Sequence, residues 1–288
     1  MELDRFWQEL AGRVMPLLQR YRRDVVRLET REKPDRTILT DADLAVEQLV
    51  TTMIRQLDRN AVIVAEEDRR IAIRTDVLES PEWIWVVDPI DGTAEFIQPD
   101  RTEFCSVVCL LQHREPVAAF VLAPELGRGR RPLTITADRL SRTVIVNGSA
   151  VTARPTEWPK KVSVTRGRDT PPRSFELALQ EAGYSLKTRT TSQTLDMVRT
   201  AVDLRPFTDD SLAPFRLFYR ANQKVWDGLA GLCLGESVGH RSVDGHGKAR
   251  LPVAVEILSQ SEPKFDVTVM GLAEEVELLM SIDQQERH

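Results

Sequence analysis

The chain has 288 residues, of which 42% are hydrophobic and 29% are charged, a balance that is typical of a folded globular protein. Its net charge of −5 gives no overall positive field, which argues against a nucleic-acid polymer as a partner. Its three cysteines follow no metal-ligand spacing, and neither a signal peptide nor a bilayer-spanning apolar run is visible, so we expect a cytoplasmic protein with no membrane partner.

Two amphipathic helices open the chain. Apolar residues recur every three or four positions over residues 3–29, which predicts one long helix that contains Pro16. A polar loop is expected over residues 31–36, and a second helix begins near Thr40. Asp43 stands three positions after Thr40, so the pair resembles a capping box, which would explain Asp43 on local grounds alone.

A short apolar strand is predicted over residues 61–65. It leads directly into three acids, Glu66, Glu67 and Asp68. An acidic run of this kind is usually a solvated turn. On local grounds alone, these acids therefore need no functional explanation.

A second buried strand is predicted over residues 84–87, and the sequence DPIDGT follows over residues 88–93. Its proline stiffens the turn between Asp88 and Asp91, which fixes the separation of the two carboxylates. Thr93 begins a helical segment whose free N–H groups suit a phosphate. Two carboxylates beside such a helix start are what a Mg²⁺–phosphate site requires, although Asp-Pro and Asp-Gly also occur in ordinary turns.

The rest of the chain alternates between predicted strands and helices. A hairpin is expected over residues 104–111 and 116–123, and β-rich fragments over residues 132–146 lead to Asn147-Gly148, a strong turn signal. The later elements are a strand (162–165), two helices (174–183 and 192–203), a strand (214–219), a helix (225–234), and a closing strand and helix (253–258 and 267–280).

The sequence DPIDGT after an apolar strand closely resembles the signature of the inositol monophosphatase-like superfamily of Mg²⁺-dependent, Li⁺-sensitive phosphatases. Three more segments resemble motifs of that family in the same order, namely residues 33–43, Glu66-Glu67 and residues 226–231. Asp227, in the last of these, could otherwise be explained as a charge that complements a helix N-terminus. Together the four motifs cover most of the chain.

The resemblance and the alternation of strands with helices predict an α/β fold, specifically a five-layer α/β/α/β/α sandwich of the sugar-phosphatase type. We expect an N-terminal α+β domain over residues 1–146 that carries most of the metal ligands. A C-terminal α/β domain over residues 147–288 would carry Asp227 and the elements that determine substrate specificity.

The resemblance also implies a metal site and the residues around it. Two or three Mg²⁺ ions would be held by four carboxylates and one backbone carbonyl, and Li⁺ would inhibit; the predicted ligands are Glu66, Asp88, Asp91, Asp227 and the carbonyl oxygen of Ile90.

In the same family pattern, Thr93 is hydrogen-bonded to Asp43 and orients the attacking water, with Glu67 close by. Asp43 can serve as cap and as Thr93 partner together, because a carboxylate offers several acceptor sites. The N–H groups of Gly92 and Thr93 would hold phosphate oxygens.

Two further segments resemble the nucleotidase branch of the superfamily, namely residues 95–97 (EFI) and 103–104 (EF). That branch commonly has S-R-S-H where this chain has TRGR over residues 165–168, without the histidine. The substrate-binding candidates are therefore Arg166 and Arg168 from this segment, and Asp196 from a segment where relatives contact substrate.

The leading functional prediction is a Mg²⁺-dependent 3′(2′),5′-bisphosphate nucleotidase, which would convert 3′-phosphoadenosine 5′-phosphate to AMP and phosphate. The alternatives are a phosphatase for inositol 1-phosphate, histidinol phosphate or a sugar phosphate. A third, non-enzymatic alternative is a relative that binds a phosphorylated ligand or acts as a dimeric scaffold. In each case the partner is a small phosphorylated molecule, and a homodimer is compatible with the resemblance.

Overall fold

The computed structural model describes residues 3–33, 38–68, 75–79, 83–151, 158–166, 170–209 and 212–286. None of the helices within these ranges is both long and apolar enough to cross a membrane. In chain order the elements are α1 (Leu3–Arg23), η1 (Val25–Arg27), β1 (Thr30–Glu32), β2 (Ile38–Thr40), α2 (Asp41–Leu57), β3 (Val62–Ala65), α3 (Thr75–Glu79), β4 (Trp83–Asp91), α4 (Thr93–Phe96), β5 (Cys105–Gln112), β6 (Glu115–Gly127), β7 (Arg131–Asp138), β8 (Thr143–Val146), β9 (Ser149–Ala150), β10 (Lys161–Arg166), α5 (Ser174–Glu181), β11 (Ser185–Arg189), α6 (Gln193–Ala201), β12 (Leu217–Lys224), α7 (Val225–Ser237), β13 (Arg241–Val243), α8 (Val255–Leu258), β14 (Lys264–Gly271) and α9 (Ala273–Glu286).

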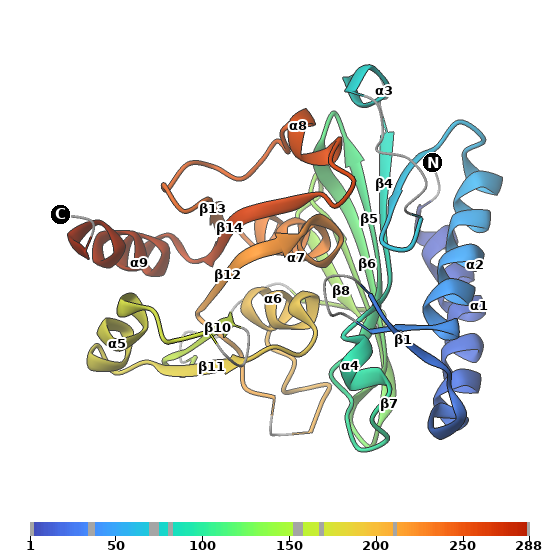
Figure 1. The fold of residues 1–288 in the computed structure, drawn as a ribbon, viewed down its shortest axis with the longest axis horizontal. Helices are drawn as coiled ribbons and strands as arrows, with labels where there is room; N and C mark the ends of the chain where they lie inside the picture. The colour runs from blue at the N-terminus through green and yellow to red at the C-terminus, as the bar shows by residue number, and fades with distance from the viewer. Residues whose placement is uncertain are drawn as a thin grey trace.

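Two large sheets alternate with three layers of helices (Figure 1). The seven-stranded sheet has the order β3-β4-β5-β6-β7-β8-β9, and the five-stranded sheet has the order β11-β10-β12-β14-β13. Helices α1 and α2 cover one face of the larger sheet, α6 and α7 lie between the sheets, and α5 and α9 cover the smaller sheet (Figure 1). The predicted five-layer sandwich is therefore confirmed.

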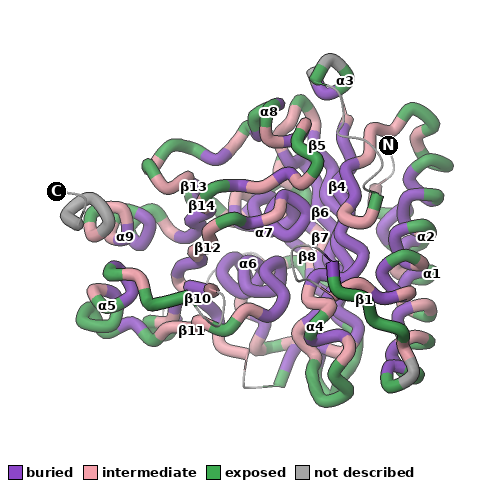
Figure 2. Tube along the Cα trace, in the orientation of Figure 1, coloured by how far each residue is buried: buried purple, intermediate pink, exposed green. Residues whose placement is uncertain are grey.

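Alternating side chains on the strands explain why both faces of the larger sheet are buried. On β4, Trp85 and Val87 pack against α1 and α2, whereas Ile84 and Val86 belong to the apolar cluster that contains α6 and α7. A strand covered on both faces reads as a continuous apolar run, which is how residues 84–87 read in the sequence. Figure 2 shows this burial extending through the larger sheet and the middle helices.

The predicted domain division at residue 146 falls inside the last hairpin of the larger sheet. Strands β8 and β9 pair with Val146 opposite Ser149, so Asn147-Gly148 forms the predicted turn. The apolar cluster between the sheets takes residues from both halves of the chain, including Val86 and Leu229. The two halves therefore share one interior.

Several predicted elements are wrong in their position or type. The loop expected over residues 31–36 begins with the short strand β1, and the strand expected over residues 253–258 is the one-turn helix α8. The closing strand is β14, which occupies the start of the helix expected over residues 267–280 and pairs with β12 and β13. Short apolar runs do not distinguish a strand from a helix, and here the pairing partners decide.

Helix α7 packs closely on α6 at Gly231, where an added Cβ would lie 2.4 Å from the Cβ of Met197. We expect Gly231→Ala to destabilise the protein, because overpacking of about 1–3 kcal/mol exceeds the roughly 0.5–1 kcal/mol that alanine gains in a helix. Gly12→Ala in α1 is the matched control, since nothing lies within 4 Å of that Cβ, and it should stabilise. Urea unfolding measures both, and equal stabilisation by the two substitutions would contradict the close packing.

Candidate active site

The acidic motif residues belong to strand β4 itself and not to a turn after it. Asp88 lies opposite Val107 on β5 and Asp91 lies opposite Cys105, so three steps on β4 match two on its partner. This is a β-bulge, and Pro89, which has no N–H to donate, is tolerated at such an irregularity. Residues three apart on a regular strand face opposite sides, so the bulge allows both carboxylates to reach the same site.

Asp227 joins these two carboxylates from α7, and one oxygen atom from each of the three aspartates lies within 4.8 Å of the others. Burial, followed by the charges of Glu66, Asp91 and Asp227, raises the pKa of Asp88 well above its usual value. Asp88 is 1% exposed, and neither carboxylate oxygen has a hydrogen-bond donor among the described residues. A buried carboxylate without donors is costly, and clustered oxygen ligands suit Mg²⁺, so the site fits a divalent cation.

The start of helix α6 binds two of the aspartates. The Oγ of Ser192 and the backbone N–H of Thr194 each donate to Oδ2 of Asp91 at 2.7 Å. The Nε2 of Gln193 donates to Oδ2 of Asp227 at 2.6 Å. Burial raises the pKa of Asp91 to about 6, although the hydrogen bonds from Ser192 and Thr194 oppose the shift. Helix α6 therefore orients carboxylates that come from two different elements.

Asp43 makes both of the contacts expected for it. Its Oδ2 accepts hydrogen bonds from the N–H and Oγ1 of Thr40, at 2.8 Å and 2.6 Å, and completes the capping box of α2. Its Oδ1 accepts from the Oγ1 of Thr93 at 3.2 Å. Burial raises the pKa of Asp43 to about 7 against the effect of the bonds from Thr40. The Oγ1 of Thr93 also lies 3.0 Å from the carbonyl oxygen of Ile90.

Lys33 holds the two glutamates that follow β3. Its Nζ lies 2.8 Å from Oε1 of Glu66 and also contacts Oε1 of Glu67. Burial works against the charged form of Lys33, but the two carboxylates outweigh it and raise the pKa of Lys33. On α2, Glu47 accepts a hydrogen bond from the backbone N–H of Glu67 at 2.7 Å. Glu66 lies at the cavity wall but outside the tight group of three aspartates.

A cavity of about 290 Å³ brings most of the predicted site residues together. Its lining includes the acids Glu66, Asp88, Asp91 and Asp227, the motif residues Ile90, Gly92, Thr93 and Ala94, and also Ile38, Thr190, Thr191, Gln193 and Arg220. Gln193 and Arg220 were not identified from the sequence. For Gln193, the available sequence signal is Ser192, which is the N-cap of α6 and so places Gln193 in the first turn of that helix.

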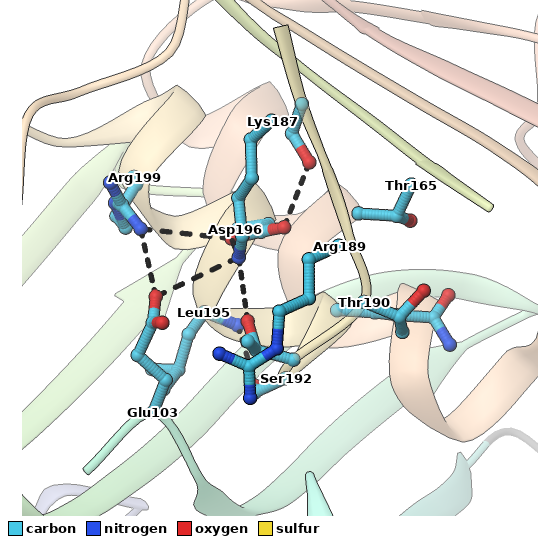
Figure 3. Close-up of polar contacts among 12 residues, drawn as sticks. Glu103, Thr165, Lys187, Arg189, Thr190, Ser192, Leu195, Asp196 and Arg199 are labelled. Atoms are coloured by element: carbon cyan, nitrogen blue, oxygen red, sulfur yellow. Dashed lines mark hydrogen bonds and ion pairs between the residues drawn. The ribbon is translucent and has the colours of Figure 1, made fainter. Parts of the chain in front are cut away.

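Two of the predicted substrate residues, Asp196 and Arg166, are described by the structure and do not line this cavity. Asp196 is fully buried, and its carboxylate binds Nζ of Lys187 at 2.5 Å (Figure 3). The same carboxylate accepts a hydrogen bond from Oγ of Ser163 at 2.8 Å. Arg166 uses its Nε to pair with Glu176 at 3.2 Å. Arg168 lies outside the described residues. We therefore do not assign Arg166 or Asp196 to the substrate-binding site.

The two glutamates of the nucleotidase-like segments bind cations from the second half of the chain. Glu103 pairs with Arg199 of α6 at 2.9 Å (Figure 3), and Glu95 contacts Arg189 at the end of β11. Neither glutamate lines the cavity. Their observed contacts join the first half of the chain to α6 and β11.

The inositol monophosphatase family model matches residues 1–278 of this chain. Among relatives, the chain is 36% identical over 110 residues to the 3′(2′),5′-bisphosphate nucleotidase CysQ of Aggregatibacter actinomycetemcomitans, covering 37% of this chain and 38% of that protein. It is 34% identical over 113 residues to the CysQ of Haemophilus influenzae, covering 38% and 39%. The match thus spans less than two fifths of these relatives.

Solved structures share the fold over nearly the whole chain. The extragenic suppressor protein suhB of Bartonella henselae superposes with a TM-score of 0.73 at 20% identity and covers 98% of each chain. A Staphylococcal IMPase-I complexed with products gives a TM-score of 0.75 at 17% identity, over 98% of this chain and 94% of that one. At sequence identities this low, the similarity shows a shared fold.

We expect Asp88→Asn to stabilise the metal-free protein at neutral pH by about 1–3 kcal/mol, because the folded protein must otherwise either bury a charge without a donor or protonate a carboxyl that is ionised in the unfolded chain. The same substitution should abolish the rise in Tm that Mg²⁺ produces in the unmutated protein. Thermal unfolding with and without Mg²⁺ tests both effects. Asp100→Asn is the control, since Asp100 is 78% exposed. A metal-free protein destabilised by Asp88→Asn that still responds to Mg²⁺ would exclude a cation site at Asp88.

Proposed function

This chain belongs to the inositol monophosphatase family, and on that premise we propose that it is a Mg²⁺-dependent phosphomonoester hydrolase. The observation that carries the proposal is the buried aspartate trio, in which Asp88 has no donor among the described residues, next to the Asp43–Thr93 pair. We propose two or three Mg²⁺ ions, inhibition by Li⁺, and a 3′(2′),5′-bisphosphate nucleotide as the substrate.

Each site residue has a proposed task. Asp88, Asp91 and Asp227, with Glu66 and the carbonyl oxygen of Ile90, would hold the cations. When bound, Mg²⁺ supplies Lewis acidity that lowers the pKa of a water and offsets phosphoryl charge. The remaining tasks fall to protein groups around the phosphate.

The single hydroxyl hydrogen of Thr93 has two acceptors within reach, Oδ1 of Asp43 at 3.2 Å and the carbonyl oxygen of Ile90 at 3.0 Å. Because that carbonyl would bind a cation, we assign the hydrogen to Asp43, which leaves an Oγ1 lone pair to orient the attacking water. Asp43, with its pKa of about 7, can receive a proton through Thr93. Glu67, held by Lys33, lies beside Glu66 at the end of β3. The bond from the water oxygen to phosphorus forms as the ester bond breaks, and the released alkoxide takes a proton from solvent water, while the proton received by Asp43 returns to solvent.

Glycine at position 92 suits the backbone that would hold the phosphate. Gly92 has φ +90°, and a Cβ there would lie 3.0 Å from the carbonyl oxygen of Glu103. Glycine is therefore needed for this backbone conformation and for the close approach of Glu103. Gly92 and Thr93 both line the cavity, where their N–H groups would hold a phosphate oxygen.

The nucleotide substrate is supported by the similarity to the CysQ proteins and by the segments at residues 95–97 and 103–104. The second candidate is an inositol monophosphate, which is supported by the match of the inositol monophosphatase family model to residues 1–278. The two candidates differ in one decisive respect, since only the nucleotide carries a second phosphate that does not react.

A substrate panel tests the proposal. We expect phosphate release that depends on Mg²⁺. The kcat/KM for 3′-phosphoadenosine 5′-phosphate should be at least about tenfold higher than for inositol 1-phosphate or histidinol phosphate, because a charge-assisted contact to the second phosphate raises kcat/KM by about this factor. Highest activity on inositol 1-phosphate would establish the second candidate. No release from any phosphoester would favour a binding protein.

Thr93→Ala should lower kcat by about a hundredfold or more, since it removes the group that orients the water and links it to Asp43. Thr93→Ser keeps the hydroxyl and should restore most of the rate. Steady-state kinetics with Mg²⁺, accompanied by thermal unfolding of each variant, measures this. Equal rates for the alanine and serine variants would remove Thr93 from the mechanism.

A further inference from the structure

We propose that Arg220 forms a second anion subsite in the cavity, which binds a charged group of the substrate that is not cleaved, in the first place a second phosphate. The inference rests on the proposed phosphatase function and specifies its substrate class. It assigns a role to a residue that no sequence motif identified.

Arg220 belongs to β12 and lines the same cavity as Asp88, Asp91 and Asp227. Its Nη1 donates to the Oγ1 of Thr165 at 3.2 Å and to the Oγ1 of Thr190 at 3.1 Å. These two threonines come from β10 and from the segment after β11, and both are labelled in Figure 3. The hydroxyls fix one end of the guanidinium and carry no charge.

The other donors of Arg220 lack a matching anion. Its Nε is buried without a hydrogen-bond partner, and no carboxylate of the described residues lies within 4.0 Å of its guanidinium. Three neighbouring arginines differ in this respect, because Arg166, Arg189 and Arg199 each pair with a glutamate. A buried guanidinium that keeps free donors is costly unless an anion binds there.

The charges around the cavity favour an anion at this point. Burial lowers the pKa of Arg220, the charges of Asp227 and Asp91 oppose that shift, and Arg173 adds to it. Cations bound at the aspartates would offset those negative charges. Asp196 also acts on Arg220, but its carboxylate is already bound by Lys187 and Ser163. A charged group of the substrate would therefore be the anion that contacts Arg220 directly.

The chemistry of the guanidinium indicates the kind of group. Its planar donors match the oxygens of a phosphate or carboxylate, which they bind in pairs. An inositol monophosphate offers only hydroxyls beyond its reacting phosphate, so it would leave Arg220 without an anion. A substrate with a second phosphate could place its reacting phosphate at the aspartates and its second phosphate at Arg220. Arg220, and not Arg166, is therefore the cation for that phosphate.

Two nucleotides that differ only in the non-reacting group provide the kinetic test, namely 3′-phosphoadenosine 5′-phosphate and adenosine 3′-monophosphate. The unmutated enzyme should prefer the bisphosphate, and Arg220→Gln should lower the ratio of the two kcat/KM values by about tenfold or more. Arg220→Lys keeps the charge without the paired donors, so its ratio should be intermediate. Arg241→Gln is the control, because this half-exposed arginine of β13 pairs with Glu277 at the surface, at 3.4 Å.

A binding measurement tests the subsite without turnover. By calorimetry in Mg²⁺, Arg220→Gln should weaken the binding of 5′-AMP, which keeps the non-reacting phosphate, by about tenfold relative to adenosine. Thermal unfolding checks that each variant is folded. If Arg220→Gln does not fold, the lysine variant gives the same comparison.

The outcomes separate this inference from the proposed function. Equal losses on both nucleotides, no preference for the bisphosphate in the unmutated enzyme, or a fall in the ratio with Arg166→Gln in place of Arg220→Gln would overturn the subsite. Absence of hydrolysis with any substrate, together with 5′-AMP binding that depends on Arg220, would overturn the proposed function and leave the subsite standing.

Discussion

Mutual repulsion among buried carboxylates is the constraint on which the rest of this site depends. One oxygen from each of Asp88, Asp91 and Asp227 lies within 4.8 Å of the others, and each of these residues is less than a tenth exposed. Water cannot screen these charges, so neighbouring groups must offset them. The donors at the start of α6 and the ammonium of Lys33 do so in part, while the oxygens of Asp88 have no hydrogen-bond partner among the described residues.

A second set of buried charges fixes α6 in its position between the sheets. Asp196 of this helix binds Lys187 and Ser163 in the smaller sheet, while Arg199 of the same helix reaches Glu103, which precedes β5 (Figure 3). Buried ion pairs add little net stability, but removing one partner leaves an unpaired charge. Helix α6 is therefore held between the two sheets by contacts whose loss would misalign its first turn, and with it Asp91 and Asp227.

The sequence predicted the parts of the site that rest on local signals. Thr40 and Asp43 form a capping box because they are three residues apart, and residues 84–87 are apolar because β4 is buried on both faces. The five-layer fold followed from the order of elements and motifs. The strand assigned to residues 253–258 was wrong, because a short apolar run carries no information about its pairing partner. Arg220 and Gln193 could not be predicted, because their importance arises from residues distant in sequence.

The contact between Ser192 and Asp91 joins residues 101 positions apart, and Asp227 comes from still further along the chain. A chain in which only the larger sheet has formed would have the bulge of β4 but neither α6 nor Asp227 beside it. Closure of such long loops comes late in folding because its entropic cost precedes any compensating contact. A cation that needs all three aspartates would therefore act mainly on the rate of unfolding, and would give the native state a longer lifetime without hastening its formation.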